Sequence, residues 1–197
     1  MRLGILGGTF DPIHFGHLRL AVEAKEALKL DDVVLEVAAQ SPFKLETPPT
    51  EGGTRCEMVK CALDRCHNMR VGNVDLRRSG PSYTIDTVQA YAEPGTEVWL
   101  IVGTDALSGI PKWKDPERLL QMCRIGVGFR PGQDFAAAIG ELSEHWRKRI
   151  RAFPTPLLEI SSTDIRKRVA NGQSVRYMTP QCVVQIIERS SLYRIER

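Results

Sequence analysis

Two histidines three residues apart, His14 and His17, lie in the segment GGTFDPIHFGH at residues 7–17. On the first turn of a helix this spacing places both imidazoles on one face, and Gly16 between them has no side chain to obstruct a ligand. Preceding glycines and a helix N-terminus favour a phosphate, to which the imidazoles can donate hydrogen bonds as charge develops on a leaving pyrophosphate. The segment predicts a polyphosphate site. For the histidine pair alone, a strand–turn–helix junction with two solvated side chains is the alternative.

A second segment, ISSTDIR at residues 160–166, places hydroxyl residues where a helix is expected to begin. In one interpretation Ser161, Ser162 and Thr163 are ordinary helix N-caps. In the other, their hydroxyl and backbone N–H groups approach phosphates, and Arg166, one turn beyond Ser162, faces the same anions. Two helix N-termini that suit phosphate in one chain are more informative than either alone.

Other nucleotide-binding motifs do not occur in the sequence. The pattern GxxxxGK[ST] is absent, and Gly4, Gly7 and Gly8 do not have the GxGxxG spacing. The sequence therefore disfavours a P-loop protein, and a dehydrogenase loses its main support.

Strands and helices are expected to alternate along the chain. The apolar pattern predicts strands at 2–6, 33–39, 70–75, 97–103, 124–129 and 157–160. It predicts helices at 15–30, 54–66, 84–92, 116–122, 133–147, from 161 onward and at about 180–190. The stretch 40–53, rich in proline, glycine and threonine, is expected to be a mobile loop.

This alternation predicts an α/β fold, a Rossmann-like doubly wound parallel sheet with helices on both faces. A small C-terminal helical segment at about 161–197 completes what we expect to be a single domain, 1–197. Ligands of such sheets bind beyond the carboxyl ends of the strands, and both segments fall at those ends or in the loops that follow them.

The composition is that of an ordinary globular protein, with 42% hydrophobic and 26% charged residues and a formal net charge of +3. Charge alone does not favour nucleic acid, and the run RKRIR at 147–151 is expected to be a solvated helix end. No run of about twenty apolar residues or signal peptide is recognisable. Five cysteines without a CxxC pair disfavour a disulfide framework or a zinc site. We expect a cytoplasmic protein with no membrane or nucleic-acid partner, and a homo-oligomer is compatible with the sequence.

The segments GGTFDPIHFGH and ISSTDIR are similar to the two signatures of the HxGH adenylyltransferase superfamily. Three further stretches, GPSYTIDT at 80–87, GTDALSGIPKW at 103–113 and RPG at 130–132, resemble the bacterial nicotinate-nucleotide adenylyltransferases within it. The five stretches occur in the order of that family and span nearly the whole chain. One departure lies at Gln40-Ser41-Pro42-Phe43-Lys44, where the family usually has Pro-Pro-His-Lys. The lysine is in register, and Phe43 replaces the histidine.

The resemblance implies transfer of AMP from ATP to nicotinate mononucleotide, which gives the dinucleotide and pyrophosphate in NAD biosynthesis. Mg²⁺ would enter with the ATP, because no dedicated carboxylate cage is visible. Nicotinamide mononucleotide or pantetheine phosphate are the alternative acceptors. A non-catalytic protein that binds nucleotides or RNA is the alternative from another class.

The resemblance also implies roles for individual residues. His14 and His17 would be catalytic. The ATP site would comprise Gly7, Gly8, Thr9, Phe10, His14, His17, Ser161, Ser162, Thr163 and Arg166. The mononucleotide site would comprise Lys44, Tyr83, Thr84, Asp105, Trp113 and Arg130, with Trp113 stacking on the pyridine ring. Taken without the family, Trp113 would be a half-buried core aromatic, Asp105 a helix N-cap and Arg130 a surface turn residue.

Overall fold

A six-stranded sheet forms the centre of the molecule in a computed structural model that describes all residues except 41–47, 108, 133–134, 141 and 195–197. All neighbouring strands are parallel, in the order β3-β2-β1-β4-β5-β6. The strands are β1 (Arg2–Gly8), β2 (Asp32–Val37), β3 (Met69–Gly72), β4 (Glu97–Gly103), β5 (Cys123–Phe129) and β6 (Ile150–Pro154). The strands with continuous apolar runs are central, as expected of a parallel sheet that is buried on both faces.

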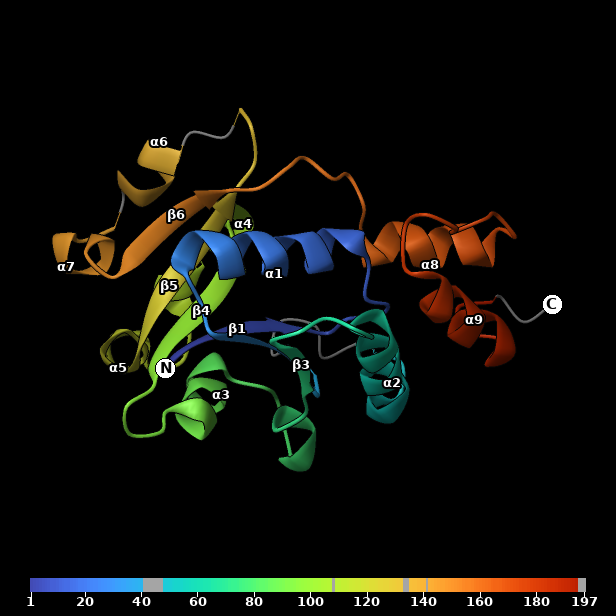
Figure 1. Cartoon of the computed structure of the whole chain (residues 1–197), viewed down its shortest axis with the longest axis horizontal. Helices are drawn as coiled ribbons and strands as arrows, with labels where there is room; N and C mark the ends of the chain where they lie inside the picture. Colours follow the sequence, from blue (N-terminus) through green and yellow to red (C-terminus); the bar gives the residue numbers. More distant parts are fainter. Residues whose placement is uncertain (41–47, 108, 133–134, 141, 195–197) are drawn as a thin grey trace.

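Helices cover both faces of this sheet (Figure 1). The first face carries α1 (Phe15–Leu28), α2 (Gly52–Ala62), α8 (Ser162–Ala170) and α9 (Gln181–Arg189). The second carries α3 (Thr84–Tyr91), α4 (Thr104–Leu107), α5 (Pro116–Met122) and α7 (Glu144–Arg147), with α6 (Phe135–Gly140) and the 3₁₀ turn η2 (Ile110–Lys112) nearby. The 3₁₀ turn η1 (Asp75–Arg77) follows β3, and its Leu76 packs against the core of the first face. The predicted doubly wound α/β architecture is confirmed. In the part of the chain that is described, no helix is both long and apolar enough for a membrane span.

The two central strands separate toward their carboxyl ends. The pairing of β1 with β4 ends at Ile5 and Leu100, although β1 continues to Gly8 and β4 to Gly103. On its other side β1 stays paired with β2 as far as Gly8 and Val37. Because the chain reverses its winding direction between β1 and β4, this is the topological switch point, where ligands bind in open α/β sheets.

Glycines in β5 allow α1 to lie close to the sheet. A Cβ at Gly126 would be 2.5 Å from Leu28 Cδ1, and a Cβ at Gly128 would be 2.5 Å from Leu20 Cδ1. The two glycines therefore let the side chains of Leu20 and Leu28 pack directly on the backbone of β5.

Three of the expected elements were wrong. The predicted strand at 157–160 is a connection, and the last strand is β6, at the edge of the sheet, with Arg151 exposed. Residues 147–151 are thus not one solvated helix end. The predicted helix at 133–147 is interrupted, because Ser143 is extended and precedes the separate helix α7. The predicted loop at 40–53 ends earlier, because Glu51 caps α2 by accepting from Gly53 N and Thr54 N.

Candidate active site

The turn between β1 and α1 carries the two histidines of the first segment. Phe10 lies buried beneath this turn with a positive φ of 48°, and a Cβ at Gly8 would come within 2.8 Å of its ring. His14 is the N-cap residue of α1, and its carbonyl accepts from His17 N at 3.0 Å. The glycine at position 8 is therefore required by the packing of Phe10, which positions the turn.

The imidazoles of His14 and His17 are stacked on each other, with ring centroids 3.7 Å apart. Phe10 meets the His17 ring edge-on at 5.0 Å. A Cβ at Gly16 would lie 3.0 Å from the His14 ring, so Gly16 makes room for His14, and Gly16 also lines the first cavity. Both Nδ1 atoms are buried without a hydrogen-bond partner among the described residues. Both residues line a cavity, so the two imidazoles form part of its wall.

Burial keeps both histidines neutral in the free protein. His14 is 6% exposed, and burial lowers its pKa from 6.5 to about 4. The pKa of His17 is lowered well below its ordinary value, first by burial and second by the neighbouring His14. A neutral imidazole still has one N–H donor and one acceptor. The pair can thus donate hydrogen bonds to an anion at pH 7 without being charged beforehand.

Acidification is expected to destabilise the free protein through this pair. With a folded pKa of about 4 and an unfolded pKa near 6.5, His14 binds more protons in the unfolded chain between these values. Stability rises with pH wherever the unfolded state binds more protons, so this contribution is complete above pH 6.5 and is lost as the pH falls toward 4. We expect His14→Asn to reduce the loss of unfolding free energy between pH 7 and pH 4.5 by about 2 kcal/mol.

Urea unfolding at a series of pH values measures this effect. The matched control is His67→Asn, because His67 is exposed and lies away from both cavities. It should retain the pH dependence of the unmodified protein. An equally steep pH dependence in His14→Asn would contradict the assignment.

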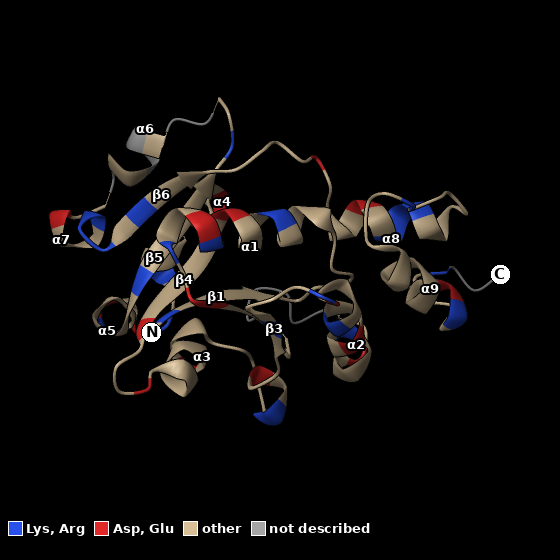
Figure 2. Cartoon of the chain, viewed as in Figure 1, with Lys and Arg blue, Asp and Glu red and all other residues tan. Residues whose placement is uncertain are grey.

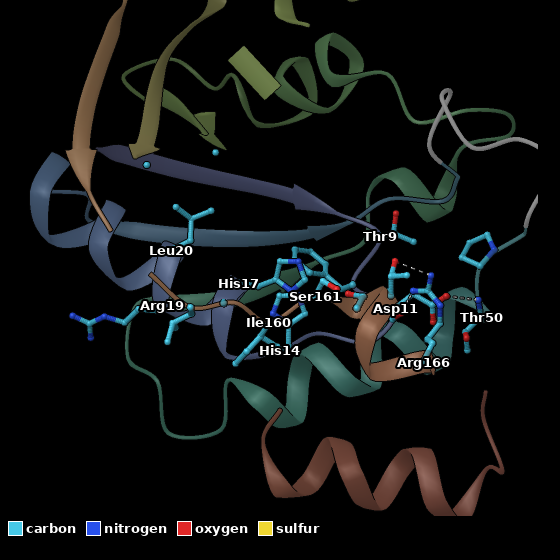
Figure 3. Close-up of a pocket in the computed structure, with 18 of the residues that line it drawn as sticks. Thr9, Asp11, His14, His17, Arg19, Leu20, Thr50, Ile160, Ser161 and Arg166 are labelled. Carbon is cyan, nitrogen blue, oxygen red and sulfur yellow. Dashed lines mark hydrogen bonds between the residues drawn. The ribbon is translucent and has the colours of Figure 1, made fainter. Parts of the chain in front are cut away.

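The N-terminus of α8 lies against the same turn, so the two sequence segments meet. Ser162 Oγ donates to the carbonyl of Pro12 at 2.8 Å, and Arg166 Nη1 donates to the carbonyl of Asp11 at 2.7 Å. Ser161 Oγ accepts from Asp164 N and caps the helix. Figure 3 shows Ser161 beside the histidines and Arg166 beside Asp11. The capping interpretation of this segment is confirmed for Ser161, and the phosphate-binding interpretation stays a prediction about a helix start that lines the first cavity.

Three residues around Asp11 were missed by the sequence analysis. The buried Asp11 carboxylate accepts from Tyr193 Oη at 2.5 Å and from Thr50 N at 3.2 Å. Arg55 is 1% exposed. Its guanidinium donates to the backbone carbonyls of Thr9, Ala38, Ala39 and Thr50. The sequence carries one signal for the burial of Arg55. The apolar residues Met58 and Val59 follow it at the three- and four-residue spacing of one helix face, and both are fully buried in the structure.

Two cavities meet at this edge of the sheet. The first, of about 670 Å³, lies between the histidine turn, the end of β5 and α8, and the second, of about 510 Å³, opens where β1 and β4 separate. Both are lined by Thr9, His17, Leu20 and Gly103. A molecule in one cavity would therefore contact a molecule in the other beside His17.

The expected site residues divide between these cavities. The first is lined by Thr9, Phe10, His14, His17, Arg130, Ser161, Ser162, Thr163 and Arg166. The second is lined by Gly7, Gly8, Thr9, His17, Tyr83, Thr84 and Trp113. Arg130 thus lies with the residues expected for ATP, and Gly7 and Gly8 lie with those expected for the mononucleotide. Asp105 is exposed and lines neither cavity, and Lys44 is outside the described residues.

The wall of the second cavity is held by hydrogen bonds between β2 and the start of α3. Ala39 N donates to Ser82 Oγ at 2.8 Å, and Ser82 N donates to the carbonyl of Gln40 at 3.0 Å. Thr87 Oγ1 donates to the buried Asp75 carboxylate at 2.7 Å, which also forms an ion pair with Arg78. These contacts fix the N-terminus of α3, where Tyr83 and Thr84 lie.

Comparison with known proteins agrees with this geometry. The model of the cytidylyltransferase-like family matches residues 5–168. The chain is 41% identical to the probable nicotinate-nucleotide adenylyltransferase of Roseiflexus sp. (strain RS-1), over 98% of both chains. It is 39% identical to the protein of that name in Thermomicrobium roseum, over 98% of this chain and 92% of the relative. The fold matches the Plasmodium falciparum nicotinic acid mononucleotide adenylyltransferase complexed with NaAD, with a TM-score of 0.78, 17% identity, and coverage of 98% of this chain and 97% of that one.

Proposed function

The chain belongs to the nicotinate-nucleotide adenylyltransferases of the cytidylyltransferase-like family, and we propose that it transfers the adenylyl group of ATP to nicotinate mononucleotide. The products are the nicotinate adenine dinucleotide and pyrophosphate, a step of NAD biosynthesis. The observation that carries this proposal is the pair of cavities that share Thr9 and His17. Each cavity suits one nucleotide, and their junction suits the phosphorus that is transferred.

The first cavity is assigned to ATP. Its walls combine the neutral N–H donors of His14 and His17 with the N-terminus of α8 and the Arg166 guanidinium. Figure 2 shows the concentration of basic positions on α8, where Arg166, Lys167 and Arg168 follow one another. Backbone N–H groups at a helix start and an arginine fork both bind phosphate oxygens well. The triphosphate therefore lies between α1 and α8, with its α-phosphorus toward His17.

The second cavity is assigned to the mononucleotide. Trp113 and Tyr83 offer aromatic faces to the pyridine ring, and the backbone N–H of Thr84 at the start of α3 suits the ring carboxylate. The assignment of Lys44 and Arg130 to the mononucleotide phosphate rests on the resemblance, and Arg130 lines the first cavity and not the second. The assignment of Asp105 to the ribose rests on the resemblance alone.

The reaction requires positioning more than covalent chemistry. The mononucleotide phosphate attacks the α-phosphorus of ATP in line, and the bond to the pyrophosphate oxygen breaks. No enzyme-bound intermediate is needed, because a phosphate is already a competent nucleophile. The chain holds two anions in register and donates hydrogen bonds to the leaving pyrophosphate.

We propose that the reaction uses a divalent cation, Mg²⁺, and that the phosphate oxygens of the substrates would hold it more than side chains of the protein. In the described part of the protein, no group of three His, Cys, Asp or Glu side chains could hold a metal ion. Mg²⁺ is commonly bound through substrate phosphates and water. When bound, it neutralises charge on the phosphate oxygens, and Arg166 acts beside it.

We propose that the whole chain is one nucleotidyltransferase domain. Ile165 of α8 and Val183 of α9 belong to the same buried cluster as Ala21 of α1 and Leu35 of β2. The C-terminal helices thus share a core with the sheet, and Arg166 reaches the site from them.

Arg166 provides the test of the ATP assignment. We expect Arg166→Met to raise the KM for ATP about 10- to 100-fold, because it removes charge-assisted hydrogen bonds to phosphate oxygens. The KM for the mononucleotide should change less than about threefold. Arg168→Met is the matched control, because Arg168 lies on the same helix, donates to the carbonyl of Ser174 and lines neither cavity. Equal KM values for ATP in the two variants would contradict the assignment.

The activity itself is tested with the purified protein, ATP, Mg²⁺ and nicotinate mononucleotide. We expect pyrophosphate and the dinucleotide to form in equal amounts, measured by a coupled pyrophosphate assay and by chromatography of the nucleotides. Omission of the mononucleotide should abolish pyrophosphate release. Release that is independent of the mononucleotide, or no dinucleotide at all, would overturn the proposal.

A further inference from the structure

The second cavity has a fixed ammonium group at its rim. Lys114 follows Trp113, lines the cavity, and places Nζ 4.5 Å from the centroid of the Tyr83 ring. The same Nζ lies 3.4 Å from Asp86 Oδ2. Lys114 is thus held beside the two aromatic residues that the proposed function assigns to the pyridine ring.

The surroundings leave this rim positive. Asp86 is shared, because Arg78 Nη1 also lies 3.8 Å from its Oδ2. Asp75, the acidic residue that lines the cavity, forms its own ion pair with Arg78. Lys112 is a second cation in the lining, and the N-terminus of α3 adds the positive end of a helix dipole. A negative group in the cavity would therefore be stabilised, and a positive one destabilised.

We propose that Lys114 is a specificity-determining residue, which makes the cavity prefer a pyridine mononucleotide with a ring carboxylate over its carboxamide counterpart. The proposal rests on the proposed function, because it requires that the ring enter the second cavity. The N-substituted pyridine ring carries a positive charge. In the acid the carboxylate neutralises this charge and attracts the ammonium group, whereas the amide leaves the ring cationic beside Lys114.

The expected effect is moderate because Lys114 is partly solvated. Its side chain is 45% exposed, so water and salt weaken a Coulomb interaction that would be large in a dry site. We expect Lys114 to account for about a tenfold share of the preference for acid over amide. The alternative is an ordinary surface ion pair with Asp86, which would leave substrate preference unchanged.

The test compares kcat/KM for nicotinate mononucleotide and nicotinamide mononucleotide. Lys114→Met should lower the ratio of kcat/KM for the acid to kcat/KM for the amide about tenfold. Lys114→Arg, which keeps the charge, should retain this ratio within about threefold. The matched control is Lys148→Met, because Lys148 also pairs with a carboxylate, Glu144, but lines neither cavity. This control should keep the original ratio. Added salt should lower the ratio for the unmodified protein and for Lys114→Arg more than for Lys114→Met.

Calorimetric binding of each mononucleotide without ATP gives the same comparison independently of turnover. An unchanged ratio in Lys114→Met, by rate and by binding, would overturn the role of Lys114, as would an equal loss in Lys114→Arg. If the unmodified protein forms no dinucleotide from either substrate, the proposed function fails instead. Binding with the expected change in preference would then still support Lys114 as a selector in this cavity.

Discussion

Replacement of His17 by alanine is expected to lower turnover about 10²- to 10³-fold, which is the cost of removing one preorganised donor at a site of developing charge. His17 lines both cavities, so its ring lies where the transferred phosphorus must pass from one nucleotide to the other. Its Nδ1 has no hydrogen-bond partner among the described residues. Because Nδ1 is buried, a ligand would reach the ring on the side that lines the cavities.

The expected loss lies in kcat more than in substrate binding. His14 stacks on His17 and, under the proposed function, would still contact the phosphates, so ground-state affinity for ATP should fall much less than the rate. His17→Gln retains an N–H donor and should keep more of the activity than His17→Ala. Steady-state rates with both substrates saturating, together with the binding constant for ATP, separate the two effects.

His67→Ala is the control for the loss of an imidazole, because His67 is exposed and lines neither cavity. A near-normal kcat in His17→Ala would remove His17 from the catalytic role. A fall in affinity for ATP as large as the fall in rate would make it a binding residue. Circular dichroism of the variant at pH 7 shows whether the fold is kept.

The elements with one strong local signal could be predicted from the sequence. The strand at 97–103 was predicted with its observed bounds, because a continuous apolar run ends at Gly103. The helix at 116–122 was also predicted with its bounds, because Pro116 suits the first helical turn. The strand β6 was missed because Arg151 interrupts its short apolar pattern, and its pairing with β5 is a long-range contact that no local pattern contains.

That the two segments lie at the carboxyl edge of the sheet could also be predicted, but the contacts that join them could not. Asp11 and Tyr193 are 182 positions apart in the sequence, and only the fold brings the tyrosine hydroxyl to the carboxylate. Lys114 was missed for a related reason. Its role depends on where its ammonium group lies relative to Tyr83 and Asp86, and no spacing in the sequence indicates this.

Arg55 is the residue whose replacement is expected to cost most stability. Its Nε donates to the carbonyl of Thr50 at 2.6 Å, and its Nη1 donates to those of Thr9 and Ala38, both at 2.7 Å. Nη2 donates to a fourth carbonyl, that of Ala39, at 3.2 Å. One buried cation thus joins the histidine turn, the end of β2 and the residues before α2.

Arg55→Met is expected to lower the free energy of unfolding by about 3–5 kcal/mol, because it leaves buried carbonyls without donors. This is a large fraction of the roughly 5–15 kcal/mol that stabilises an ordinary domain. Thr9 lies at the junction of the two cavities, so turnover should fall as well. Urea unfolding monitored by circular dichroism gives the free energy, provided that the slope with urea is unchanged.

Two further variants keep this prediction testable if Arg55→Met does not fold. Arg55→Lys retains the charge and up to three donors without the planar fork, so it should lose less stability than Arg55→Met. Arg65→Met is the matched control, because the Arg65 side chain is 93% exposed and its ion pair with Asp64 is on the surface. If Arg55→Lys and Arg65→Met unfold at the same urea concentration as the unmodified protein, the turn is positioned by other contacts.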